Sequence, residues 1–314
     1  MIELLDRKLL FVTGKGGVGK TTIAASLALL AAQRGKRTLV GEMDAKGNLA
    51  DFYETGSTTF REREVSPGLW AMSMDTEESL KEYLSLQLKI PFIARLGPLA
   101  RTFDFVANAA PGVKEILSIG KFLWEVRERS YDLVVVDAAA TGHITGQLAA
   151  PQAIQELVQV GMVRDQTGWM LDILGDPHQT GVVIVSAPEE MPVNETLELA
   201  ERLHTDTVVD LAAVVANRVL PELFGRAEEA VFDALTELPE EVLAGAVGGP
   251  ARQLLDGAQL AVRLRRTRGV HLARLRNELP AGTPLLYVPY LFQRSHGARA
   301  TSQVAAHLGE ELGF

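Results

Sequence analysis

Three segments of the chain are continuous apolar runs with no polar alternation: LVVVD at 133–137, GVVIVS at 181–186 and AAVVAN at 212–217. Such runs are typical of strands that are covered by helices on both faces of a sheet. Helical patterns fill most of the gaps between predicted strands at about 8–13, 37–42, 132–136, 181–186, 209–216 and 284–288. This alternation predicts an α/β fold with a mainly parallel sheet.

Residues 76–128 depart from the alternation, because three helical patterns follow one another there without a strand. They are interrupted at Pro91 and at Pro111-Gly112. No repeat or linker divides the chain, so we expect a single domain over 1–314 with these helices inserted. Their apolar residues, among them Leu80, Phe92 and Phe122, recur at helical spacing. They are expected either to pack as core or to line a groove for a hydrophobic protein client.

A glycine-rich loop, GKGGVGKT at 14–21, matches the phosphate-loop pattern G-x-x-x-x-G-K-[ST]. A predicted strand precedes it and a predicted helix over 20–34 follows, which is the order that the motif requires. Glycines let successive N–H groups face an anion, Lys20 would reach the β and γ phosphates, and the Thr21 hydroxyl would ligate Mg²⁺. The candidate ATP-binding residues are Gly14, Lys15, Gly16, Gly17, Val18, Gly19, Lys20, Thr21 and Thr22.

Further candidate residues follow other predicted strands. Asp137 ends a strand at the carboxyl edge of the sheet, where ligands bind in such folds, and it could instead cap a loop. Asn217 could pair with the adenine edge of a nucleotide or act as a turn residue. Asp44 could instead cap a turn, and Lys15 could be a surface charge without a functional role. His143 is expected to have a switch or packing role.

Several segments resemble the ArsA-like ATPases, which have a deviant phosphate loop. The loop reads TGKGGVGKTT at 13–22, DAKGNL at 44–49 is similar to their switch I, and DAAATGH at 137–143 to their switch II. PGVKE at 111–115, APEEMPVNET at 187–196 and the later ANR and VP segments extend the resemblance over most of the chain. MinD and ParA share little beyond the loop.

The resemblance implies a role for each of several residues. Lys15 would reach across a dimer to the partner's nucleotide, and Asp44 would orient the attacking water, so Lys15, Lys20 and Asp44 are the candidate catalytic residues. Thr21 and Asp137 would hold Mg²⁺, the latter through water. Pro289 would place backbone groups near the base. Ala45 and Ala140 stand where the family has prolines, which bears on the rate of hydrolysis.

Composition excludes several other classes of protein. A net charge of -9 argues against a nucleic-acid partner, because phosphate contacts need a concentrated basic face. The tight basic run at 263–268 does not keep its arginines on one helical face. The absence of cysteine excludes disulfides and thiolate metal sites. We expect no signal peptide and no membrane-spanning segment, and we expect a cytoplasmic location.

The sequence therefore predicts a Mg²⁺-dependent ATPase that dimerises around nucleotide, as a homodimer or with a paralogous ATPase, and opens and closes a client surface. Two alternatives stay open. One is a weakly hydrolysing subunit that pairs with an active paralogue. The other is a positioning ATPase of the MinD and ParA kind, which would need a basic face or a terminal amphipathic helix.

Overall fold

One eight-stranded sheet organises the computed structural model, which describes residues 3–44, 49–88, 112–157, 162–222, 224–247, 251–292 and 297–314. The strand order is β3-β4-β2-β5-β1-β6-β7-β8, and every neighbouring pair is parallel except β3 and β4. The strands are β1 (Leu9–Gly14), β2 (Thr38–Glu42), β3 (Arg63–Ser66), β4 (Leu69–Ser73), β5 (Leu133–Asp137), β6 (Thr180–Ser186), β7 (Leu211–Val219) and β8 (Leu285–Pro289). The predicted α/β fold with a mainly parallel sheet is confirmed.

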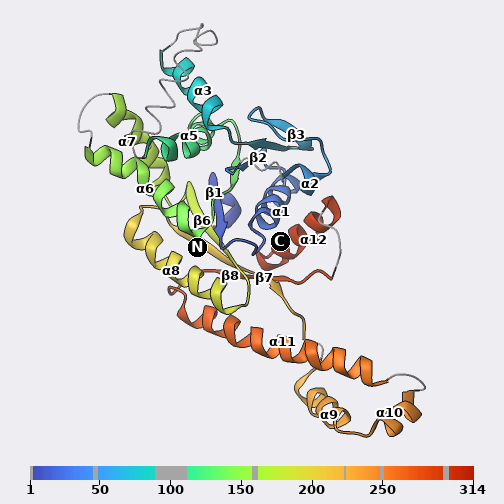
Figure 1. Cartoon of the computed structure of the whole chain (residues 1–314). Coiled ribbons are helices and arrows are strands. Elements are labelled where there is room, and N and C mark those ends of the chain that lie inside the picture. Colours follow the sequence, from blue (N-terminus) through green and yellow to red (C-terminus); the bar gives the residue numbers. More distant parts are fainter. Residues whose placement is uncertain are drawn as a thin grey trace.

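Helices cover both faces of this sheet (Figure 1). On one face, Leu10 and Val12 pack with α1 (Lys20–Gln33), α2 (Leu49–Tyr53) and α12 (Ala298–Glu311). On the other face, Leu9 and Phe11 pack with α5 (Val113–Arg127), α6 (Thr141–Leu157), α7 (Met162–Gly175) and α8 (Glu190–Asp206). Alternate residues of each central strand therefore enter opposite cores, and this double burial explains the continuous apolar runs.

The hairpin of β3 and β4 was not among the predicted strands. Ser66 pairs with Leu69 across a Pro67-Gly68 turn, in which Gly68 has a φ of 76°. Because β3 is an antiparallel edge strand, its residues are exposed or half-buried, and no apolar run marks it. The Pro-Gly pair followed by the apolar Leu69–Ser73 segment is the signal that could have predicted it.

Two of the helices expected over 76–128 are described: α3 (Thr76–Leu88) and α5. The predicted middle helix around Phe92 lies outside the described residues. The apolar stripe of α5, with Ile119, Phe122 and Leu123 fully buried, packs against the sheet. This stripe is therefore core.

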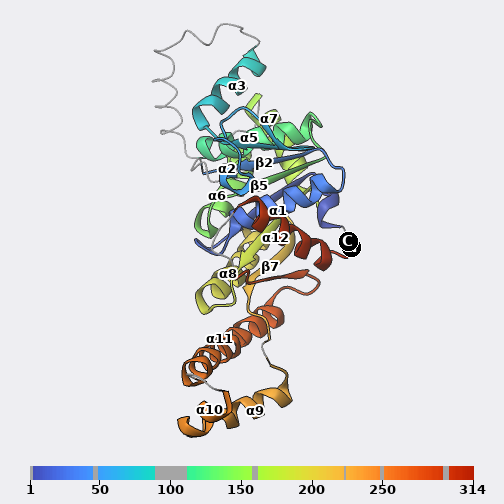
Figure 2. The same cartoon turned by 90° about the vertical axis from the view of Figure 1, so that its right-hand side faces the viewer.

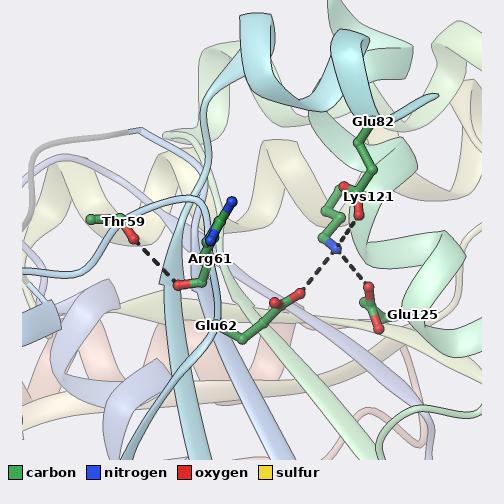
Figure 3. Close-up of polar contacts among 6 residues, drawn as sticks. All are labelled: Thr59, Arg61, Glu62, Glu82, Lys121 and Glu125. Atoms are coloured by element: carbon green, nitrogen blue, oxygen red, sulfur yellow. Dashed lines mark hydrogen bonds and ion pairs between the residues drawn. The ribbon is translucent and has the colours of Figure 1, made fainter. Parts of the chain in front are cut away.

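An ion cluster around the buried Lys121 joins α3 and α5 to the segment that leads into β3 (Figure 3). Lys121 of α5 lies 2.7 Å from Glu125, 2.9 Å from Glu62 and 3.1 Å from Glu82, measured between side-chain nitrogen and oxygen. Burial lowers the pKa of Lys121, but the adjacent Glu125 and Glu62 carboxylates outweigh this effect and raise it above its ordinary value. The lysine is therefore held in its charged form.

Between β7 and β8 the chain forms three helices: α9 (Arg226–Thr236), α10 (Glu240–Val247) and α11 (Ala251–Glu278). Figures 1 and 2 show this helical arm extending from the sheet at the end opposite α3. In the described parts of the chain, we find no helix with the length and apolar character that crossing a membrane demands.

Candidate functional site

The loop between β1 and α1 folds back against two neighbouring segments, and this close packing explains two of its glycines. A Cβ on Gly14, whose φ is 149°, would lie 2.2 Å from the carbonyl oxygen of Val185. A Cβ on Gly19, whose φ is 97°, would lie 2.4 Å from Nδ2 of Asn217. Neither a side chain nor an ordinary L-residue backbone fits at these two positions. The predicted order of strand, loop and helix is present, with Lys20 and Thr21 at the start of α1.

Asn217 on β7 forms a hydrogen bond with the phosphate loop. Its buried Nδ2 donates to the carbonyl oxygen of Val18 at 2.8 Å, and its Oδ1 accepts from the backbone N–H of Arg218 at 2.9 Å. An amide nitrogen carries two hydrogens, and the bond to Val18 uses only one hydrogen of Nδ2. Pro289 ends the neighbouring strand β8 and lies opposite Val219 of β7. Contact of Asn217 and Pro289 with a base stays a prediction.

Thr21 and Asp137 meet where α1 begins and β5 ends. The Thr21 hydroxyl donates to Oδ2 of Asp137 at 2.6 Å, whereas Oδ1 of Asp137 is buried and has no hydrogen-bond partner. Burial raises the pKa of Asp137 to about 6; the Thr21 hydrogen bond and the Lys20 charge oppose this effect, and the charges of Glu42 and Asp44 add to it. A buried carboxylate without enough partners is unfavourable, and a cation can supply the missing one.

These residues fit a Mg²⁺ ion, because a hydroxyl and a carboxylate oxygen are ligands that Mg²⁺ accepts and one buried oxygen has no partner. Across the ranges that the structure covers, no group of three or more His, Asp or Glu side chains could hold a metal unaided. An ion at Thr21 and Asp137 would therefore need further oxygen ligands, and nucleotide phosphates are the expected source.

Asp44 follows β2 and His143 lies near the start of α6, and both side chains are exposed. Glu42 of β2 pairs in register with Asp137 of β5, so Asp44 and Asp137 lie at the same edge of the sheet. Residues 45–48, which complete the predicted switch I, lie outside the described residues. The proposed role of Asp44 in orienting water therefore stays a prediction, as does a switch role for His143.

Lys15 is held by its own chain. Its Nζ donates to Oε1 of Glu195 on α8, and the Thr141 hydroxyl donates to Oε2 of the same carboxylate at 3.0 Å. The Lys15 hydrogen bond is the main reason why the pKa of Glu195 is lowered, with a smaller contribution from Thr141. Glu195 thus links the phosphate loop to the predicted switch II. Sequence reasoning gave Glu195 no role; its one signal was its place in APEEMPVNET.

Further contacts connect the loop to the same edge. The Thr13 hydroxyl donates to the carbonyl oxygen of Ala139 at 2.7 Å, and Lys20 Nζ lies 3.4 Å from the carbonyl oxygen of Lys15. Two lysines, a helix start and a carboxylate with one unpartnered oxygen therefore meet at the carboxyl ends of neighbouring strands. This arrangement suits a polyphosphate that carries a divalent cation.

Comparison with known proteins agrees with this geometry. The family model described as anion-transporting ATPase matches residues 7–170 and 160–230. ATPase BagA of Mycobacterium tuberculosis is 31% identical over 225 residues, which cover 68% of this chain and 66% of BagA. ATPase GET3 of Podospora anserina is 31% identical over 175 residues, covering 54% of this chain and 52% of GET3. The chain thus spans between about half and two thirds of the length of these relatives.

Proposed function

Since the chain belongs to the anion-transporting ATPase family, we propose that it is a Mg²⁺-dependent ATPase whose site is the edge formed by the phosphate loop, Asp44 and Asp137. The observation that carries this proposal is the Thr21–Asp137 pair with its buried, unpartnered Oδ1. This oxygen lies beside the loop, where a phosphate-bound cation would meet it.

In this proposal each side chain acts by position and charge. Lys20 leaves the Lys15 carbonyl to contact the β and γ phosphates, and the loop N–H groups hold the phosphate oxygens. Thr21 and Asp137 would hold the Mg²⁺, and a bound Mg²⁺ would supply positive charge beside the phosphates. Asp44 accepts a hydrogen bond from the attacking water and orients it toward the γ phosphorus.

The proposal also includes an ATP-bound dimer, either of two identical chains or of this chain with a paralogous ATPase. Lys15 exchanges the Glu195 carboxylate for the phosphates of the partner's nucleotide, so one favourable charge contact replaces another. Because Glu195 also accepts from Thr141, its release frees the start of α6. The relatives named GET3 and BagA support an ATPase, and a hydrophobic protein client is our extension of the proposal.

An Asp44→Asn variant tests the hydrolytic step. The amide keeps the size of the carboxylate but loses the charge that orients water, so ATP should bind as in wild type while turnover falls at least about tenfold. Turnover is measured by phosphate release and binding by calorimetry. If turnover is unchanged, Asp44 is a turn residue and the switch I assignment fails.

A second candidate function is a weakly hydrolysing subunit that pairs with an active paralogue. Two observations favour it: Ala45 and Ala140 replace family prolines, and Lys15 is engaged within its own chain. Purified chain alone would then bind ATP with negligible turnover, and a paralogous subunit would restore it. Substantial turnover by the isolated chain rejects this alternative.

A further inference from the structure

A groove outside the nucleotide site runs between α11 and β8, the last strand of the sheet. Two adjoining hollows, of about 540 and 370 Å³, are both lined by Arg276 and Tyr287. The smaller one continues along the turn at 280–283 to Leu285. Figure 1 shows α11 passing below the sheet near β8.

One wall of this groove is a single face of α11. Arg265, Gly269, Leu272, Ala273 and Arg276 line it at spacings of three and four residues, which is the repeat of one helical face. A Cβ on Gly269 would meet nothing closer than an Arg265 nitrogen at 4.0 Å. The small residues therefore hollow the wall, and Leu272 gives it an apolar floor.

The groove is positively charged in a chain whose net charge is -9. Arg265, Arg266 and Arg276 line it together with one carboxylate, Glu222, and Arg266 also pairs with Asp233 of α9 at 3.4 Å. Arg265 Nε is buried without a hydrogen-bond partner, and the nearest approach of this arginine to Glu222 is 3.8 Å. Among the residues that the structure describes, Arg276 forms no hydrogen bond or ion pair through its side chain. The lining therefore has guanidinium donors available to an anionic ligand.

The other wall is the open edge of the sheet. Val214 pairs with Leu285 and Ala216 with Tyr287, and the N–H of Val214 donates to the carbonyl oxygen of Pro284. In a parallel ladder this register turns the backbone groups of Leu285 and Tyr287 away from β7. The outward N–H of Tyr287 donates to a carboxylate oxygen of Glu311 at 2.9 Å. A side-chain carboxylate thus stands where the carbonyl of an added strand would lie.

We infer that this groove binds an extended acidic peptide segment, which adds a strand to β8 and sets its carboxylates against Arg265 and Arg276. A peptide carbonyl would replace the exposed Glu311 carboxylate at the Tyr287 N–H, and alternate side chains would face the arginines. A second copy of this chain fits poorly, because pairing two β8 edges would bring two arginine-rich helices together. The partner is therefore a different, acidic segment.

The test uses a short fluorescent peptide of alternating glutamate and valine, with binding followed by anisotropy in the intact protein. Arg276→Glu should weaken binding at least about tenfold, since it reverses a charge in the groove. Gly269→Trp should have a similar effect by filling the hollow. Arg263→Glu makes the same charge change on another, exposed face of α11 and should leave binding unchanged.

Two further probes separate strand addition from simple charge attraction. The same peptide with alternate backbone amides methylated keeps its charge but cannot pair with an edge, so its binding should be lost. A lysine and valine peptide should not bind. Equal binding of the methylated or basic peptide would overturn the inference, as would binding of free glutamate or phosphate alone. Insensitivity to both Arg276→Glu and Gly269→Trp would also overturn it.

Discussion

The unpartnered oxygen of Asp137 makes the nucleotide-free site less stable than it could be. Its carboxylate is buried with one hydrogen bond from Thr21, and burial raises its pKa to about 6. A carboxyl group whose pKa is higher in the folded than in the unfolded protein stabilises the fold only while it is protonated. The charge that would hold a cation therefore costs stability when no cation is bound.

Replacing Asp137 with asparagine should stabilise the nucleotide-free protein. The amide oxygen still accepts from Thr21, and no charge is buried. Raising the pKa from 3.8 to about 6 corresponds to up to about 3 kcal/mol. The wild-type fold loses up to this amount of stability as Asp137 ionises while the pH rises from 3.8 through about 6. The advantage of the variant should therefore be small at pH 4 and full at pH 7.5. Thermal unfolding at both pH values, in EDTA, measures it.

The matched control is Asp172→Asn on the exposed surface of α7, which should leave the midpoint unchanged at both pH values. A destabilised Asp137→Asn variant at pH 7.5 would show that the carboxylate has an essential partner in the folded protein. Such a result would contradict the absence of a partner for Oδ1.

Residues that belong to a contiguous motif could be predicted from the sequence, and residues that act through long-range contacts could not. The phosphate loop is contiguous, and its spacing fixes which residues surround an anion. Glu195 lies 180 positions from Lys15 along the chain, and only the packing of α8 beside the loop brings them together. The Val18 contact of Asn217 is likewise a product of strand order.

The helices α3 and α5 are joined to the edge hairpin by one buried lysine. Figure 3 shows Lys121 between Glu62, Glu82 and Glu125. Removing the lysine charge leaves the buried Glu125 and the half-buried Glu62 and Glu82 without their counter-ion, which is costly. We therefore expect this cluster to set how firmly α3 is held.

A Lys121→Met variant should lower the free energy of unfolding by about 3 kcal/mol or more, because it keeps the aliphatic stem and removes the charge. Lys81 of α3 offers a matched control, since it pairs with Glu77 and Glu78 at the exposed surface. Lys81→Met should hardly move the midpoint, since exposed ion pairs contribute little. Urea unfolding compares the two, and equal midpoints would contradict the structural role of the cluster.

The buried central strands carry a sequence signal along their whole length, whereas the hairpin is marked only by its Pro67-Gly68 turn and by β4. A strand covered on both faces is marked by a continuous apolar run, as in β5 and β6. The residues of β3 are exposed or half-buried, so no continuous apolar run identifies this strand in the sequence. Periodicity within one helix does not say whether that helix packs on the sheet or projects from it, as α9 and α10 do.

For the whole molecule, the Lys15–Glu195 pair relates the isolated chain to the proposed dimer. Lys15→Ala should reduce the ATP-promoted dimer fraction while ATP binding by the monomer changes little. Glu195→Gln should raise that fraction at low ATP, because Lys15 loses its competing carboxylate. Light scattering with a non-hydrolysable ATP analogue measures both, and a dimer fraction of Lys15→Ala equal to wild type would reject the role in trans.

The assignment of this edge as the nucleotide site is tested by ATP affinity, measured by calorimetry in Mg²⁺ and in EDTA for wild type, Lys20→Ala and Lys36→Ala. Lys36 pairs with Asp6 away from the loop and serves as the matched control. Lys20→Ala and removal of Mg²⁺ should each weaken binding at least about tenfold, or about 1.4 kcal/mol, while Lys36→Ala should bind as wild type. Undiminished affinity of Lys20→Ala would contradict the assignment of this edge as the nucleotide site.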